Sequence, residues 1–161
     1  MIPSYTPTLS AMLSASQSIG PLKVMTVIQP HTPGQRSLPF TRDESKNIKK
    51  YVPSESWTEI GSSEHPTSID DVLFHLKTVS IAHFACHGEQ DLKSPLDSAL
   101  LLSDGRLKMS RLMEEPLFNA HLAFLSACQT ATGASEVPDE AIHLAATMLY
   151  AGFRGVVGTM W

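Results

Sequence analysis

Two residues of the sequence carry the side chains of a cysteine nucleophile and its base, Cys128 and His87. Each stands at the end of a strongly apolar run: His87 follows VSIAHFAC at residues 79–86, and Cys128 follows the run at residues 122–127. Such runs are typical of parallel strands that are buried on both faces. Because catalytic groups gather beyond the carboxyl ends of parallel strands, we expect the imidazole and the thiol to be neighbours at one sheet edge.

The chemistry of such a pair is nucleophilic attack on a carbonyl carbon. A thiol has an ordinary pKa of about 8.5, so it needs a base that removes its proton and later protonates the leaving amine. The tetrahedral intermediate also needs hydrogen-bond donors for its oxyanion. We predict His87 and Cys128 as catalytic residues and the backbone N–H groups of Gly88 and Cys128 as the oxyanion donors, with Gly88 permitting a close approach of substrate.

The elements that must position this pair alternate between strands and helices along the chain. Apolar and β-branched runs predict strands, and apolar residues at helical spacing predict helices. The predicted strands span residues 22–29, 57–60, 79–86, 122–127 and 155–160, and the predicted helices span residues 41–51, 69–76 and 138–151. This alternation favours an α/β sandwich of three layers, with a mainly parallel central sheet flanked by helices.

Local signals refine these elements. Thr41 and Glu44 have the spacing of a capping box, and Gly152 is a natural end for the last helix. An Asp-Gly turn within residues 100–107 predicts a small hairpin beside the main sheet. The apolar side of one further short helix is assigned to Met109, Leu112 and Met113.

Four segments carry a resemblance to a known family: HFACHG at residues 83–88, LSACQTA at 125–131, DE at 139–140 and LYAGFRGVVGTMW at 149–161. In type, order and spacing they resemble the CHAT domain, a branch of the caspase and separase superfamily of cysteine peptidases. The resemblance implies a caspase-like sandwich, a thiol protease that hydrolyses peptide bonds in partner proteins, and no cofactor. It places the family's catalytic residues on His87 and Cys128.

The same resemblance sets the expected domain organisation. Residues 1–20 are an irregular lead-in and residues 21–161 form the CHAT domain, whose relatives continue past the tryptophan with a further helix and strand. We therefore expect a C-terminal element to be missing after Trp161. CHAT domains often follow tetratricopeptide repeats in longer parent chains, and this sequence shows no such repeat.

A catalytically silent signalling or protein-interaction module is the alternative function. The expected loss of part of the substrate cleft favours this module, whereas the presence of both His87 and Cys128 favours the peptidase. A zinc site is a third hypothesis, because His83, Cys86, His87 and Cys128 are ligand types that zinc accepts. Since Cys86 and His87 are adjacent and would point to opposite sides of a strand, we predict no metal, a structural His83 and a packed Cys86 thiol.

The composition argues against nucleic-acid binding, a membrane span and secretion. The formal net charge is -4 and the pI is about 5.9, so the chain has no excess of basic residues for binding nucleic acid. Apolar stretches reach only about eight residues, well short of a membrane span. The first twenty residues have no basic residue before their apolar stretch, unlike a secretory signal. We expect a cytoplasmic protein that binds a protein or peptide substrate, without nucleic acid or membrane.

Overall fold

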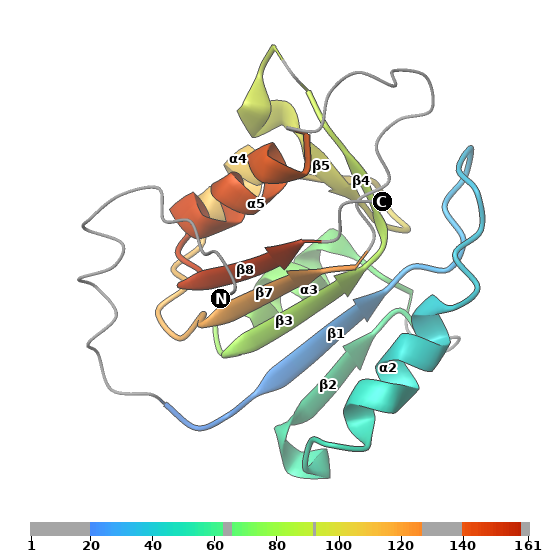
Figure 1. The fold of residues 1–161 in the computed structure, drawn as a ribbon, viewed down its shortest axis with the longest axis vertical. Helices are drawn as coiled ribbons and strands as arrows, with labels where there is room; N and C mark the ends of the chain where they lie inside the picture. The colour runs from blue at the N-terminus through green and yellow to red at the C-terminus, as the bar shows by residue number, and fades with distance from the viewer. Residues whose placement is uncertain (1–19, 63–65, 92, 127–139, 159–161) are drawn as a thin grey trace, which may run out of the picture.

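A parallel sheet forms the centre of the computed structural model, which describes residues 20–62, 66–91, 93–126 and 140–158 (Figure 1). Within these residues the strand order is β2-β1-β3-β7-β8, and all neighbouring strands are parallel. The strands are β1 (Val24–Ile28), β2 (Trp57–Ile60), β3 (Ile81–Ala85), β7 (Leu122–Leu125) and β8 (Gly155–Gly158). The order puts β3 in the middle, with β7 as its direct neighbour.

Helices cover both faces of this sheet. One face carries α2 (Thr41–Lys49), and the other carries α3 (Ile69–Leu76), α4 (Met109–Met113) and α5 (Glu140–Ala151). Short turns of 3-10 helix occur at Ser54–Ser56 and Pro95–Asp97. The predicted three-layer α/β sandwich with a mainly parallel sheet is confirmed. None of the helices in the described segments is long and apolar enough to cross a membrane.

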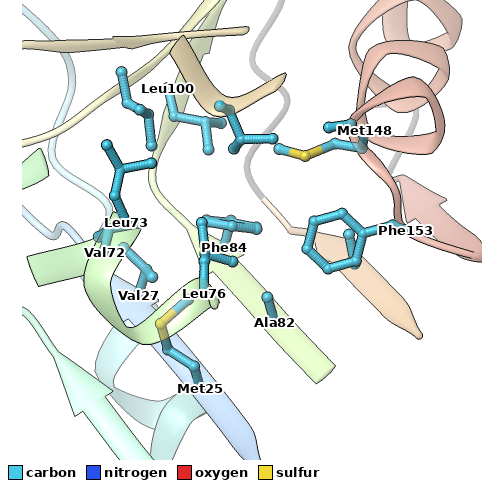
Figure 2. Packing of buried hydrophobic residues seen from close by; sticks show 14 of the residues in the cluster. Met25, Val27, Val72, Leu73, Leu76, Ala82, Phe84, Leu100, Met148 and Phe153 are labelled. Atoms are coloured by element: carbon cyan, nitrogen blue, oxygen red, sulfur yellow. The ribbon is translucent and has the colours of Figure 1, made fainter. Parts of the chain in front are cut away.

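The hydrophobic core lies on the sheet face that carries α3, α4 and α5. Alternate residues of the strands point into it, since successive side chains of a strand face opposite sides. Phe84 from β3 packs there with Leu76 from α3 and Met148 from α5, as Figure 2 shows. Each large apolar side chain buried in this way contributes about 1.5–3 kcal/mol. The core therefore fixes the central strand against the helices on one side.

A second, antiparallel sheet follows directly after β3. It consists of β4 (His87–Glu89), β5 (Ala99–Leu101) and β6 (Arg106–Lys108), in that order. The β5–β6 hairpin confirms the turn predicted from the Asp-Gly pair, and Gly105 adopts a φ of +149° in it. This small sheet gives the chain beyond β3 a fixed direction, because β4 pairs with β5.

The C-terminal end of α5 has the predicted glycine cap. The backbone N–H of Gly152 donates to the Leu149 carbonyl at 3.2 Å, and that of Phe153 donates to the Met148 carbonyl at 3.2 Å. This pair of bonds is a Schellman motif, and Gly152 adopts the positive φ that the motif needs, +119°. The predicted start of this helix at 138–139 lies outside the described residues.

One apolar prediction for α4 is wrong. Met109 and Leu112 are fully buried, but Met113 is 39% exposed. Because α4 contains a single turn and a little more, its buried face takes Met109 and Leu112, and the residue following Leu112 points towards solvent.

Gly61, which follows β2, provides a test of this architecture. It has a φ of +100°, and a Cβ atom there would collide with the Ile28 carbonyl and the Thr67 side chain. We expect Gly61→Ala to lower the free energy of unfolding by at least about 3 kcal/mol, through backbone strain and the clash together. The control is Gly34→Ala, where φ is +77° and the space is open, and only about 1–2 kcal/mol is expected. Urea unfolding measures the free energy of unfolding of both variants. Equal losses of this free energy in the two variants would contradict the close packing around Gly61.

Candidate active site

His87 occupies the carboxyl end of the central strand. Only Cys86 separates it from β3, and His87 is the first residue of β4. Its side chain is 2% exposed. The turn from β3 into the second sheet therefore holds the imidazole at the sheet edge where the sequence placed it, and shields it from solvent.

A backbone carbonyl orients the His87 ring. Its Nε2 atom lies 2.7 Å from the carbonyl oxygen of Arg36. Since a carbonyl oxygen only accepts hydrogen bonds, Nε2 carries a hydrogen and Nδ1 is the nitrogen that takes up a proton in the neutral ring. The contact thus selects both the orientation of the ring and the atom that can act as a base.

Arg36 belongs to a loop that is held in place by backbone hydrogen bonds within the loop. The Leu38 N–H donates to the Pro30 carbonyl at 2.8 Å, and the Gln35 N–H donates to the Thr32 carbonyl at 3.0 Å. These bonds bring the chain back over the carboxyl end of β1 before α2 begins. The sequence predicts a turn rich in proline and glycine here, but residue types alone do not reveal which carbonyl reaches His87.

The end of β7 lies beside the end of β3. Phe84 and Leu125 are partners in the parallel ladder, and the Ser126 N–H continues it by donating to the Phe84 carbonyl at 3.0 Å. His87 stands three positions after Phe84, and Cys128 stands three positions after Leu125. Cys128 itself, with its thiol and its amide, lies outside the described residues, so the structure brings together the two strand ends rather than the two reacting atoms.

A polar cluster on the α2 face of the sheet joins these strands. One carboxylate oxygen of Glu44, Oε2, accepts a hydrogen bond from Ser126 Oγ at 2.6 Å and lies 3.1 Å from His83 Nε2. The His83 ring also stacks at a tilt of 30° on Phe124, with 5.1 Å between the ring centroids. His83 therefore points into a sheet face, as predicted, while His87 lies beyond the strand end.

The capping box predicted from Thr41 and Glu44 is wrong. The N-cap residue of α2 is Phe40, and no side chain caps the helix. Thr41 is the first helical residue and donates its hydroxyl to the Leu38 carbonyl at 3.0 Å. The Glu44 carboxylate turns towards the sheet because two partners, His83 and Ser126, are available there in a partly buried setting.

The other predicted site residues take different places. Gly88 lies in β4 opposite Leu100 of β5, directly after His87. Cys86 is 1% exposed and belongs to the hydrophobic core. In the part of the chain that the structure describes, no group of three or more His, Cys, Asp or Glu side chains is arranged to hold a metal ion.

The described residues form a caspase-like α/β sandwich, in which a buried imidazole follows the central strand and, in the sequence, a cysteine follows the neighbouring strand. A family model described as the CHAT domain matches residues 2–161, so the chain belongs to the CHAT domain family. A comparison with curated proteins finds no match.

The pKa of His83 leads to a prediction about stability. Burial lowers this pKa, because desolvation disfavours the imidazolium more than the hydrogen bond and charge of Glu44 favour it. In the unfolded chain the group returns to an ordinary pKa of about 6.5. The unfolded state therefore binds the proton more readily than the folded state does. The contribution of neutral His83 to the free energy of unfolding is complete above about pH 6.5 and is lost as the pH falls below it.

We expect His83→Gln to flatten the pH dependence of the free energy of unfolding between about pH 7.5 and about pH 5.5. Urea unfolding at a series of pH values measures it. His75→Gln on α3 is the matched control for loss of an imidazole. An unchanged slope in His83→Gln would contradict the lowered pKa.

Proposed function

We propose that this CHAT domain is a cysteine endopeptidase that cleaves peptide bonds in partner proteins, with Cys128 as nucleophile and His87 as general acid and base. One observation carries the proposal: Phe84 pairs with Leu125 in parallel strands, and each candidate residue stands three positions later in the sequence, beyond its strand end. Strands in register advance equally per residue. Equal offsets therefore favour an imidazole and a thiol that leave the sheet side by side.

The proposed reaction begins with transfer of the Cys128 thiol proton to His87 Nδ1, which is the nitrogen that the Arg36 contact leaves as the base. The thiolate attacks the peptide carbonyl carbon, and the N–H groups of Gly88 and Cys128 donate to the oxyanion. When the tetrahedral intermediate collapses, the C–N bond breaks and His87 protonates the leaving amine. Water, deprotonated by His87, then hydrolyses the thioester and restores the thiol.

The surroundings of His87 suit this role. During the reaction the ring becomes an imidazolium, and the Arg36 carbonyl accepts a hydrogen bond from Nε2 in both forms of the ring. This acceptor keeps the ring in one orientation and partly offsets the cost of a positive charge at a site that is 2% exposed. Proton transfer and leaving-group protonation then use one atom, Nδ1, without rotation of the ring.

The substrate is a protein or peptide in this proposal. Ser126 and Gln129 flank the nucleophile in the sequence, and neither carries a charge. These neighbours do not favour a charged residue at the cleavage site. Tetratricopeptide repeats in a longer parent chain would be the means of bringing the partner protein to the site.

Covalent labelling with a thiol-reactive peptidyl electrophile tests the proposal, read out by mass spectrometry on intact and digested protein. We expect labelling at Cys128 rather than Cys86, loss of label in Cys128→Ala, and labelling slower by about a hundredfold or more in His87→Ala, since the base no longer removes the thiol proton. Cys86→Ala and His75→Ala are the matched controls and should label like the original chain. The comparison is repeated with a chain extended past Trp161.

Equal labelling of Cys86 and Cys128, or labelling of Cys128 that does not depend on His87 in the extended chain as well, would contradict the peptidase. Either result would favour the catalytically silent interaction module.

A further inference from the structure

The sheet face under α2 is unusually polar for the interior of a parallel sheet. Thr26 of β1 is fully buried and shares a hydrogen bond with Ser45 of α2 at 3.2 Å, and Ser45 in turn donates to Glu59 of β2. His83 of β3 is 6% exposed on the same face. The opposite face holds the apolar core, so stability alone would favour apolar side chains here as well.

Glu44 connects this polar face to the strand that leads to Cys128. Its Oε2 atom accepts the Ser126 hydroxyl at 2.6 Å, a distance typical of a charge-assisted bond. The same oxygen faces His83 Nε2 at 3.1 Å. Because burial lowers the pKa of His83, the ring is neutral near pH 7, and its Nε2–H donates to the carboxylate. One carboxylate thus ties His83, in the middle of β3, to Ser126, which directly follows β7, through side chains.

Ser126 is therefore held at two points. Its N–H donates to the Phe84 carbonyl in the strand ladder, and its hydroxyl donates to Glu44. It stands two positions before Cys128 in the sequence. Fixing both the backbone and the side chain of Ser126 fixes the point from which the chain continues to Cys128.

We propose that Glu44 is a positioning residue for the nucleophile: through Ser126 it sets where the segment carrying Cys128 leaves β7, and through His83 it ties that point to the strand leading to His87. The inference rests on the proposed function, because it assumes that Cys128 is activated by His87. Glu44 does not touch the reacting atoms in this account.

A positioning role and a purely electrostatic role of Glu44 predict opposite effects on the ease with which the Cys128 thiolate forms. If Glu44 acted only as a nearby negative charge, removing the charge would make the Cys128 thiolate easier to form. If Glu44 positions the nucleophile, removing the hydrogen bond separates the thiol from its base, and the thiolate becomes harder to form. Ser126→Ala deletes the hydrogen bond and leaves the Glu44 charge in place, so it distinguishes the two roles.

The experiment is alkylation with iodoacetamide, which needs no recognition of substrate, followed at Cys128 and Cys86 separately by mass spectrometry over a range of pH. For Glu44→Gln and Ser126→Ala we expect alkylation of Cys128 at neutral pH to slow by about tenfold or more, and its half-maximal pH to move up towards about 8.5. The double variant should be no slower than Ser126→Ala, because both changes act on one contact, which Ser126→Ala removes and Glu44→Gln weakens by replacing a charged acceptor with a neutral one.

Asp43→Asn is the matched control. Asp43 precedes Glu44 on α2, is 64% exposed and forms an ion pair with Lys46 at 3.7 Å. Its removal should leave the alkylation profile unchanged. Thermal unfolding of each variant distinguishes a variant that does not fold from a folded variant whose nucleophile is displaced. Ser126→Ala deletes only a hydroxyl, so it keeps the test valid if Glu44→Gln does not fold.

Three outcomes overturn the inference in different ways. A lower half-maximal pH in Glu44→Gln, with Ser126→Ala unchanged, assigns Glu44 a charge effect. Unchanged profiles in both variants, with Cys128 activated in the original chain, remove the positioning role and leave the peptidase intact. Ordinary thiol reactivity of Cys128 in the original chain shows instead that the proposed function has failed, and the inference fails with it.

Discussion

The parallel pairing of β3 with β7 is the interaction on which the site depends. Hydrogen bonds join Ile81–Phe84 to Leu122–Leu125 in register, so the carboxyl ends of both strands lie at one edge of the sheet. A slip of two residues would displace the end of β7 by about 7 Å, and a slip of one would turn its side chains to the other face. Core packing of Phe84 and Leu125, both about 1% exposed, opposes either slip.

The segment from the end of β1 through α2 contacts the ends of both β3 and β7. The Arg36 carbonyl orients His87 after β3, and the Glu44 carboxylate accepts a hydrogen bond from Ser126 after β7. In Figure 1 this segment rises from the end of β1 and returns as α2 along the sheet. Its conformation is therefore linked to the orientation of the His87 ring and to the position of Ser126.

The sequence predicts the elements well where the pattern is local. The spacing of Ile69, Val72, Leu73 and Leu76 identifies α3, and the β-rich run at Trp57–Ile60 matches β2. The contacts of Arg36 and Glu44 are different, because they join residues 51 and 82 positions apart. Residue type does not reveal which backbone carbonyl makes a contact. Glu44 matched a local capping pattern, but its tertiary contacts with His83 and Ser126 replace the capping bond. The sequence predicts that His87 follows a central strand, whereas the contacts of Arg36 and Glu44 could be found only from the topology.

The central claim, that these strands bring His87 and Cys128 within reach of each other, is tested most directly by a short bifunctional alkylating agent such as dibromoacetone. The account predicts that the reagent first alkylates Cys128 and then bridges it to the His87 ring, so that digestion yields one cross-linked pair of peptides that contains both residues. A cross-link from Cys128 to another histidine, or alkylation of Cys128 with no bridge to His87, would contradict the account.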